Sequence, residues 1–479
     1  MTVFIRNGNY IAAVSVYTSK LLETPHCPIT LTNRAFAYFH LQKYSEAICD
    51  CQKALKINKF YTKAWWRLGR CYEITNRWEL AWKTYIRIYK CNESREKILL
   101  LRPLIMGPHF TKLEQLVNIS TPSFCVSNME KARGLIACTP IRERGNILSI
   151  PQQKLITKTS GFKTTWGNTF QPFEKQIKDS FLVYLVFALT QRLIQTPNDP
   201  YMLTMPNNTS NMPFFWTKEQ MSLLGLSFIR EQMVERKQNF LNIYEILQQH
   251  VPEFALLIPQ KKFLYLISLT STRNFTVLIN NVKEQLMVPF ADMINHHANP
   301  NTHWYYNDET NAFHLDATQD IEMGEMLYDS YGNHDNAFFM SVYGFSIPMN
   351  KFDRVRIMPS LFLHRDGNVT NKQFDKYRTH FKGTPQEVER HLLTYIYDRI
   401  LELSYPSSLK EDEEWLKTHT EYTPEYFIHV ALVSEKHILK EWINLIEECL
   451  GNPTKRQRKK WKSGKNERSY LKTVWSKFK

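Results

Sequence analysis

Residues 286–296 have the sequence LMVPFADMINH, residues 324–332 the sequence GEMLYDSYG, and residues 343–345 the sequence YGF. All three are short, strand-like runs of apolar and aromatic residues that glycine and asparagine interrupt. Two earlier runs, GLIA at 134–137 and GNILSIP at 145–151, have the same character, and we expect short strands joined by a turn there. Such runs predict several small sheets rather than one wound sheet.

Long helical patterns lie on both sides of these runs. Residues 179–194 (DSFLVYLVFALTQRLI) and 216–224 (WTKEQMSLL) precede them, and the apolar residues of 370–450 recur at positions i, i+3, i+4 and i+7. This spacing is typical of amphipathic helices. We therefore expect a helical insertion at about 165–270 and a helical C-terminal region.

Together these motifs resemble the SET-domain protein methyltransferases, in particular the branch of the Rubisco large-subunit lysine methyltransferase. The match runs over about residues 121–450: a GL-x-A opening, a helical insertion, the ADMINH block, the GE…YG block, the YGF strand and C-terminal helices. The family motifs NH and YG are short, and each alone is weak. At a separation of about 35 residues, with the flanking ADMI and YGF sequences, they are specific.

The resemblance implies that the chain uses S-adenosylmethionine as its cofactor. Methyl transfer to an amine needs positioning and a dry channel, but neither a metal nor a covalent intermediate. The family assigns the catalytic role to Tyr331, whose hydroxyl would lie beside the transferred methyl group; the alternative is a buried core tyrosine. The resemblance also implies a set of cofactor-binding residues: Arg273, Asp292, Met293, Ile294, Asn295, His296, Asp335, Asn336 and Ala337. For Arg273 a structural ion pair is the alternative, and His297 is expected to be a loop side chain rather than an acid–base group.

The chain departs from this family at three places. Relatives open with two glycines, whereas this chain has only Gly134 there, so a close approach of the backbone to the cofactor is less strongly indicated. The usual Ser-Arg-Ala-Phe is Thr272-Arg273-Asn274-Phe275, and we expect Asn274 to change the packing beside the pocket. Met326 replaces a common glutamate, and we expect this change to be neutral.

The residues that are expected to line the substrate pocket are Phe275, Ala291 and Phe345. A related enzyme methylates a histidine of actin, and it has an Asn and a Trp where this chain has Phe275 and Ala291. An apolar aromatic wall suits the aliphatic stem of lysine, which must be desolvated and deprotonated to attack. A protein lysine is therefore the expected target. Two alternatives stay open: a protein-histidine methyltransferase, and a non-catalytic adaptor that binds chaperones or client proteins.

The N-terminal part repeats with a period of 34 residues. Ala35 pairs with Gly69, and Ala13, Ala47 and Ala81 share one column. Small residues in such columns let two helices approach closely, and the pattern resembles the tetratricopeptide repeat at about residues 1–92. The first repeat lacks most of its first helix, so we expect the chain to start late or to be shortened at this end.

Part of this region resembles the repeats that grip the C-terminal carboxylates of heat-shock chaperones. Asn33, Lys63 and Arg67 occupy the matching positions, and the spacing of Lys63 and Arg67 puts them on one helix face. The predicted partner is therefore a chaperone C-terminal peptide, besides the protein substrate. Solvated charges on the repeat surface are the alternative.

Charge is concentrated at the C-terminal end. The chain has 479 residues and a net charge of +15, but residues 455–479 contain eleven Lys and Arg and one acid, which leaves +5 for the rest. This excludes a protein that coats nucleic acid with its whole surface. The tail resembles a nuclear-localisation cluster; non-specific contact with nucleic acid is a less favoured possibility, and a solubilising end is another.

The eight cysteines lack CxxC spacing and a companion histidine cluster, which excludes a disulfide framework and predicts no metal site. The N-terminal residues lack the pattern of a signal peptide. The longest apolar run, 181–189, is far shorter than the roughly 20 residues that span a bilayer. We therefore expect a cytoplasmic or nuclear protein without a membrane partner.

The expected fold class is multidomain, all-α and α+β, with a tetratricopeptide α-solenoid, a SET domain of small β-sheets with a helical insertion, and a helical C-terminal substrate-binding domain. The expected boundaries are 1–92 for the repeats, 93–120 for a linker, 121–350 for the SET domain, 351–452 for the helical domain and 453–479 for the basic tail.

Overall fold

The computed structural model describes residues 8–119, 123–127, 133–207, 209, 211–358, 361–365, 371–420 and 422–450. The chain forms two compact units, each built from separate segments. The first contains residues 1–155, 193–205 and 275–330, and the second contains 156–192, 206–274 and 331–479. The predicted basic tail lies outside the described residues.

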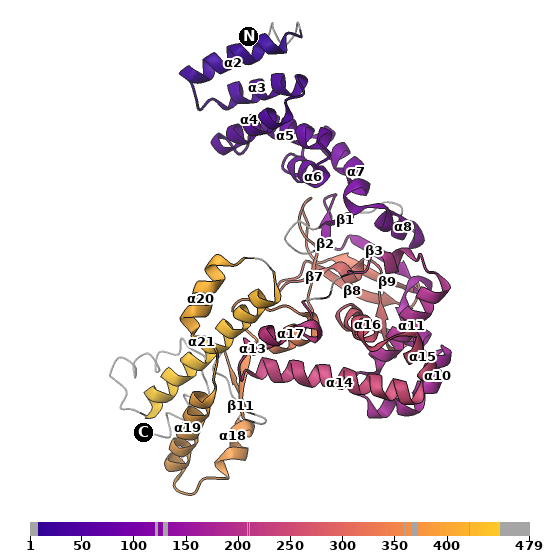
Figure 1. The fold of residues 1–479 in the computed structure, drawn as a ribbon, viewed down its shortest axis with the longest axis vertical. Coiled ribbons are helices and arrows are strands. Elements are labelled where there is room, and N and C mark those ends of the chain that lie inside the picture. Colours follow the sequence, from indigo (N-terminus) through magenta and orange to yellow (C-terminus); the bar gives the residue numbers. More distant parts are fainter. Residues whose placement is uncertain are drawn as a thin grey trace. The chain divides into compact units, whose positions relative to one another are not determined.

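The first unit begins with a stack of helices, which Figure 1 shows in indigo and violet. Successive helices pack in pairs, as the repeat pattern predicts. Their bounds are α2 Tyr10–Glu23, α3 Pro28–His40, α4 Tyr44–Ile57, α5 Thr62–Ile74 and α6 Trp78–Ile86.

The small-residue columns of the repeat make this stack possible. Ala13, Ala47 and Ala81 are all buried between helices. A Cβ added at Gly69 would lie 2.6 Å from the ring of Tyr85, so the helix backbone there touches an aromatic side chain directly. A side chain at that position would push α5 and α6 apart, and the tetratricopeptide fold expected from the sequence is confirmed.

The predicted linker is itself helical, with α7 Asn92–Met106 and α8 Pro108–Leu116. Arg102 of α7 is buried, where it pairs with Glu114 of α8 and donates from Nε to the backbone oxygen of Phe124 at 2.7 Å. This ion pair joins the helices to the first strand, so the segment is a packed part of the unit.

The expected small sheets are present. In the first unit, β1 and β2 pair antiparallel, β9 lies between β3 and β8, β7 and β10 pair in parallel, and β5 lies beside β6. The strands are β1 Phe124–Ser127, β2 Gly134–Ala137, β3 Asn146–Pro151, β5 Asn274–Ile279, β6 Val282–Met287, β7 Asn295–His296, β8 Thr302–Asn307, β9 Ala312–Ala317 and β10 Tyr328–Asp329.

The two short strands expected at 134–137 and 145–151 are present as β2 and β3, but they do not pair with each other. β2 pairs with β1, and β3 pairs with β9. The segment between them is diverted because Ile141 forms a bridge with Ile321, and the amide of Arg144, at φ 61°, donates to the oxygen of Ala317 at 2.8 Å. β2 therefore pairs with the strand just before it, and β3 pairs with the distant β9.

The second unit holds the helical insertion around one apolar core, which includes Tyr184, Phe187, Phe240, Phe254 and Phe263. The helix expected at 179–194 is confirmed as α11. The helices and the short strand here are β4 Ile156–Thr157, α9 Lys158–Phe162, α10 Thr165–Phe170, α11 Ser180–Gln195, α13 Lys218–Ser222, α14 Phe228–His250, α15 Pro252–Leu257 and α16 Gln260–Thr272. Helix α12 Pro200–Leu203 belongs to the first unit and packs on α8.

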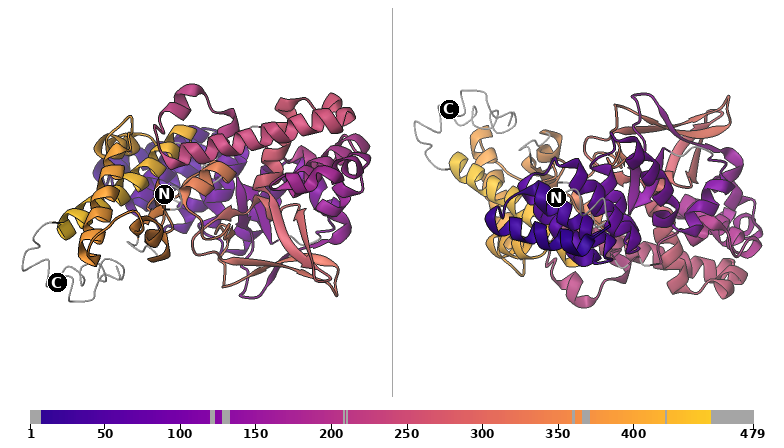
Figure 2. Two further views of the ribbon diagram at one scale, coloured as in Figure 1. Left: turned by 90° about the horizontal axis from the view of Figure 1, so that it is seen from below. Right: turned by 90° about the horizontal axis from the view of Figure 1, so that it is seen from above.

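The C-terminal helices pack on a second core, around Leu392, Ile396, Trp442 and Ile446. Both views of Figure 2 show α19 and α21 side by side, and the two helices are in contact. The elements are α17 Asn336–Tyr343, β11 Arg354–Met358, β12 Leu361–His364, α18 Asn371–Arg378, α19 Pro385–Glu402, α20 Leu409–Thr418 and α21 Pro424–Leu450.

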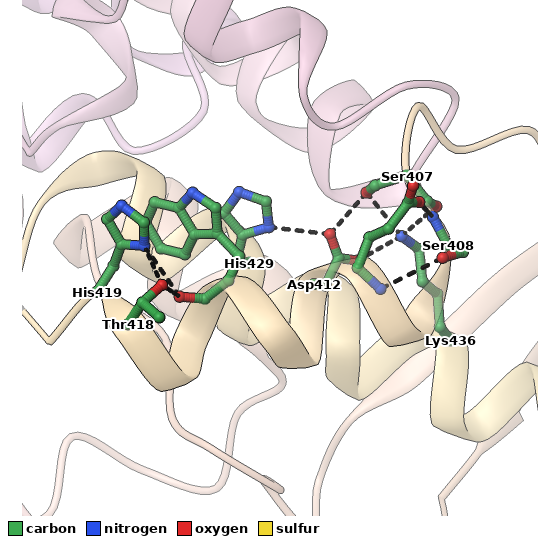
Figure 3. A network of polar contacts seen from close by, with 9 residues as sticks. Ser407, Ser408, Asp412, Thr418, His419, His429 and Lys436 are labelled. Atoms are coloured by element: carbon green, nitrogen blue, oxygen red, sulfur yellow. Dashed lines mark hydrogen bonds and ion pairs between the residues drawn. The ribbon is translucent and has the colours of Figure 1, made fainter.

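Polar contacts lock α20 against α21. Asp412 accepts hydrogen bonds from Ser407 Oγ and Lys436 Nζ, and its Oδ1 lies 2.9 Å from Nδ1 of His429 (Figure 3). The ring of Trp415 stacks on His429 with centroids 4.2 Å apart. Asp412 is fully buried, so these partners replace the water that it loses on folding.

In the described part of the chain, no helix is both long enough and apolar enough to cross a membrane. The same residues hold no group of three or more His, Cys, Asp or Glu side chains placed to bind a metal ion.

Glu435 of α21 gives a testable pH dependence. The carboxyl is 3 % exposed, accepts from Ser227 Oγ at 2.7 Å and from Tyr405 Oη at 3.1 Å, and burial raises its pKa to about 7. Because the folded state holds this proton up to about pH 7 and the unfolded chain releases it near pH 4.5, stability falls as pH rises through that window.

Glu435→Gln keeps the acceptor but removes the titration. We expect this variant to gain on the order of 1–3 kcal/mol over the wild type between pH 4.5 and pH 8, measured by urea unfolding. The control is Glu245→Gln, at an exposed position of α14. An equal pH slope for the wild type and Glu435→Gln would contradict the assignment.

Candidate active site

Gly134 opens β2 and lies directly against Asn295, both in the first unit. A Cβ at Gly134 would lie 2.6 Å from Nδ2 of Asn295 and 2.5 Å from Cε of Met326. The same Nδ2 donates to the backbone oxygen of Arg133 at 3.2 Å. One glycine therefore permits a close approach at β2, and its partners are side chains of the same unit.

Residues 292–296 form the entry to β7. The carboxylate of Asp292 is buried and accepts from Tyr201 Oη at 2.9 Å. Asn295 and His296 then pair with Tyr328 and Asp329 of β10. The predicted cofactor residues in this range thus share one buried loop and one short parallel pair, whereas Nδ1 of His297 contacts the loop oxygen of Asn299 at 2.8 Å.

Asp329 is a residue of this region that sequence reasoning missed. Its Oδ2 accepts from Nε1 of Trp304 at 3.0 Å, and burial raises the pKa of its carboxyl. The ring of Trp304 lies 5.2 Å from that of Phe275, a predicted substrate-pocket residue, and Phe275 also contacts Phe313 at 5.1 Å. The available signal was an acid in a strand, two residues before Tyr331.

Ala291, the other predicted pocket residue of the first unit, begins the 3-10 turn η4 Ala291–Met293 and is buried. The preceding residue, Phe290, has φ 66°, which turns the chain sharply into η4. The side chain of Phe290 is also fully buried and packs edge-on to Phe124 with ring centroids 5.3 Å apart. This packing fixes where residues 291–296 begin.

In the second unit, Tyr331 lies in an aromatic cluster. Its ring centroid is 4.6 Å from that of Tyr343 and 6.3 Å from that of Phe345. Phe345 also contacts Phe427 of α21 at 6.4 Å, and Ser346 Oγ donates to the oxygen of Phe427 at 2.6 Å. The structure therefore brings together the predicted catalytic tyrosine and the predicted pocket residue Phe345.

The side chains of residues 335–337 are all engaged within the fold. Asp335 caps α17 by accepting from the amide of Phe338 at 2.9 Å, and it pairs with Arg354 at 2.7 Å. Asn336 is bonded on both sides of its amide group, and Ala337 is a core residue. The side chains of this predicted cofactor segment therefore serve the packing of α17.

Arg273 follows the last residue of α16, and its neighbour Asn274 fixes that end. Nδ2 of Asn274 donates to the oxygens of Thr270 at 2.8 Å and Ser271 at 3.2 Å. These are C-terminal carbonyls that lack partners within the helix. The departure from the family at position 274 is therefore a helix cap, which sets the position of the Arg273 backbone.

The predicted partner-binding residues meet in the repeat region of the first unit. Lys63 and Arg67 line a groove of about 800 Å³ together with Phe36 and Trp66. Arg67 donates to the oxygen of Thr32, its guanidinium lies 4.8 Å from the ring centre of Phe36, and its Nη1 is 3.4 Å from Oδ1 of Asn33. Arg67 is thus held in place, whereas Lys63 is exposed.

Asn336 gives a test of the α17 anchor. Its backbone amide and Nδ2 donate to Asp353 at 2.7 and 2.9 Å, and its side chain exchanges two hydrogen bonds with the backbone of Ile347. Asn336→Ala keeps the backbone amide bond but removes the Nδ2 bond to buried Asp353 and both side-chain bonds to the Ile347 backbone, so we expect a loss of about 2–4 kcal/mol in urea unfolding.

The control for this variant is Asn242→Ala, at an exposed position of α14, where the expected change is below about 0.5 kcal/mol. Equal stabilities of the two variants would mean that the Asn336 bonds are not formed in solution.

Known proteins resemble both the SET region and the repeats of this chain. Residues 132–332 match the SET domain family. The actin-histidine N-methyltransferase of Gallus gallus is 26 % identical over 297 residues, which cover 58 % of this chain and 49 % of that protein. RNA polymerase II-associated protein 3 of Homo sapiens is 38 % identical over 85 residues, 18 % of this chain and 13 % of that protein.

Among solved structures, the SET domain of LSMT bound to MeLysine and AdoHcy matches with a TM-score of 0.62 and 17 % identity, covering 77 % of this chain and all of that chain. At this identity the match shows a shared fold. The chain spans about half the length of the actin-histidine relative and a small part of the RNA polymerase II-associated protein. Residues 132–332 thus match a SET domain, and tetratricopeptide repeats precede it.

Proposed function

We propose that this chain, with its SET domain at residues 132–332, is an S-adenosylmethionine-dependent protein-lysine N-methyltransferase. The observation that supports it most is the convergence of Gly134, Asn295 and residues 292–296 in the first unit, at the positions where the family motif lies. Two relatives, an actin-histidine N-methyltransferase and a SET domain bound to AdoHcy, favour the same chemistry.

The residues of this region fit such a cofactor. S-adenosylmethionine supplies an electrophilic methyl group when bound. Asn295 is oriented by its bond to Arg133, and His296 is held by pairing with Asp329, so both present fixed backbone groups for hydrogen bonding. Asp329 adds a half-buried carboxylate, which favours a cation in its neighbourhood.

Tyr331 is assigned the catalytic role. Its ring is fixed by Tyr343 and Phe345, so a hydroxyl on that ring is held in one place and serves to orient the incoming nitrogen. The amine reacts only after it has lost its proton, and an apolar surrounding lowers the pKa of a lysine.

Lysine is favoured over histidine by the aromatic group around Phe275. Phe275 packs edge-on against Trp304 and Phe313, an apolar surface that suits a methylene stem. The expected product is methyllysine. Methylhistidine in the product would instead support the second candidate, a protein-histidine methyltransferase, which the actin-histidine relative favours.

Tyr331→Phe tests the catalytic assignment. With labelled S-adenosylmethionine and a cell lysate, we expect methyl transfer to fall by about 100-fold or more, because one preorganised hydroxyl is lost at the reacting centre. Mass spectrometry of the labelled peptide identifies the modified residue.

The matched control is Tyr305→Phe, which removes an exposed hydroxyl bonded to Asp316 on the sheet surface and leaves the rate unchanged. Undiminished transfer by Tyr331→Phe would remove that residue from the mechanism. Failure of the wild type to bind S-adenosylhomocysteine in calorimetry would favour the non-catalytic adaptor.

We also propose that the groove of the repeats docks a chaperone C-terminal peptide. Exposed Lys63 and anchored Arg67 are the cations of a carboxylate clamp, and the aromatic rings of Phe36 and Trp66 offer apolar contact beside them.

Lys63→Ala is the cleaner test because Arg67 also supports the fold. We expect the peptide Kd to rise about tenfold, the cost of one charge-assisted hydrogen bond. Lys56→Ala, an exposed lysine on α4 that does not line the groove, is the control. If Lys63→Ala and Lys56→Ala bound the peptide with equal Kd, the carboxylate-clamp proposal would be wrong.

The basic cluster at 455–460 supports a nuclear as well as a cytoplasmic location. Weak contact of this tail with nucleic acid remains a secondary proposal, and it is tested by the salt dependence of binding.

A further inference from the structure

The groove of the repeats extends beyond the predicted clamp. One wall is the turn after α6, where residues 87–91 line it consecutively and Arg70 lines it from α5. Arg87 and Lys90 are exposed, and neither forms an ion pair with another described residue, whereas Arg70 is paired with Glu73. Among the described residues that line the groove, Glu93 is the acid that opposes these cations. The wall therefore suits an acidic peptide.

The back of this turn packs on the SET domain within the same unit. Tyr89, which lines the groove, donates its hydroxyl to the carboxylate of Glu322. Ile86, which lies just before Tyr89 in the chain, contacts the same loop. A Cβ added at Gly324 would lie 2.5 Å from Cγ2 of Ile86, and the φ angle of Gly324 is 89°. The groove wall and the loop of residues 321–326 are therefore in direct contact.

That loop is tied to β2 along its length. The amide of Gly324 donates to the oxygen of Ala137 at 2.8 Å, and the amide of Ala137 donates to Glu325 at 2.9 Å. The amide of Leu327 donates to the oxygen of Leu135 at 2.8 Å. A shift of the loop therefore moves β2 with it.

The loop also ends on the candidate cofactor residues. Cε of Met326 meets the open face of Gly134 beside Nδ2 of Asn295, and the oxygen of Met326 accepts from Asn301 Nδ2 at 2.9 Å. A short path of contacts thus joins the groove to Asn295. Tyr89 contacts Glu322, the loop of residues 321–326 continues from Glu322 to Met326, and Met326 lies beside Asn295.

We propose that an acidic peptide bound along Arg87 and Lys90 is energetically coupled to cofactor binding at Gly134 and Asn295, through the Tyr89–Glu322 hydrogen bond and the loop of residues 321–326. The second half of this coupling rests on the proposed function. A peptide that pairs with Arg87 and Lys90 holds the turn of residues 87–91, and with it the loop of residues 321–326, in one position. Cofactor binding then costs less conformational entropy, because this loop is already ordered. The expected sign is mutual strengthening, by the same factor in both directions.

The test uses the full chain with two probes, S-adenosylhomocysteine and the acetylated peptide EEEEEL with a free C-terminal carboxylate. Calorimetry measures the Kd of each probe alone and in the presence of a saturating amount of the other. In the wild type we expect each Kd to fall about fivefold when the other probe is bound.

Tyr89→Phe removes the donor of the linking hydrogen bond and keeps the ring that lines the groove, whereas Glu322→Ala removes the acceptor at a residue that does not line the groove. In both variants we expect the Kd of each probe to be the same with and without the other probe. The Kd of each probe measured alone should stay within twofold of the wild-type value. Tyr305→Phe removes a comparable exposed tyrosine–carboxylate bond on the sheet, and it should keep the fivefold coupling.

Hydrogen exchange of the Ala137, Gly324 and Leu327 amides gives a readout that needs no cofactor. Peptide-induced slowing in the wild type, absent in Tyr89→Phe, supports the coupling even if S-adenosylhomocysteine fails to bind and the proposed function falls. Unchanged exchange together with unchanged Kd values overturns the coupling. Failure of the peptide to bind also overturns it, and leaves the cofactor assignment standing.

Discussion

Asp353 is a carboxylate that is only 3 % exposed, and the segment after Tyr331 is held through it. A buried carboxylate needs donors to replace its water, and Asp353 finds them on two separate elements: the amide and Nδ2 of Asn336 at the start of α17, and Ser434 Oγ on α21. Burial still raises the pKa of this carboxyl to about 6. Hydrogen bonds to this one buried carboxylate therefore connect α17 and α21 in the second unit.

This constraint explains why α21 is polar in its middle. Ser434, Glu435, Lys436 and His437 are consecutive, and each meets a different partner: Asp353, Ser227, Asp412 and Glu413 in turn. Consecutive helix residues point in different directions, so one turn of α21 joins the loop before β11, the start of α14 and helix α20. The C-terminal helices are thereby fixed to the segment that follows Tyr331, and a change in this turn is expected to reach α17.

In the first unit, close packing depends on glycines, which have no side chain to keep neighbouring elements apart. Gly69 lets α5 touch the ring of Tyr85, Gly134 admits Met326 and Asn295 to the backbone of β2, and Gly324 seats the loop of residues 321–326 on Ile86. Each contact brings backbone within reach of a neighbouring side chain. Through these close approaches the repeats and the SET loop become continuous packed structure.

The sequence by itself determined the repeats, the helices and the presence of small sheets, because periodicity records which face of an element is buried. Ala13, Ala47 and Ala81 fall in one column and are all buried, and α11 begins and ends within one residue of its expected range. The family motifs also identified Asn295, Tyr331 and Phe345 as candidates. Only the tertiary structure decided that β3 pairs with β9, that Asn336 bonds to Asp353, and that Asp329 accepts from Trp304. These choices depend on residues far apart in the chain, and a local pattern shows that a group is buried without showing which distant partner meets it.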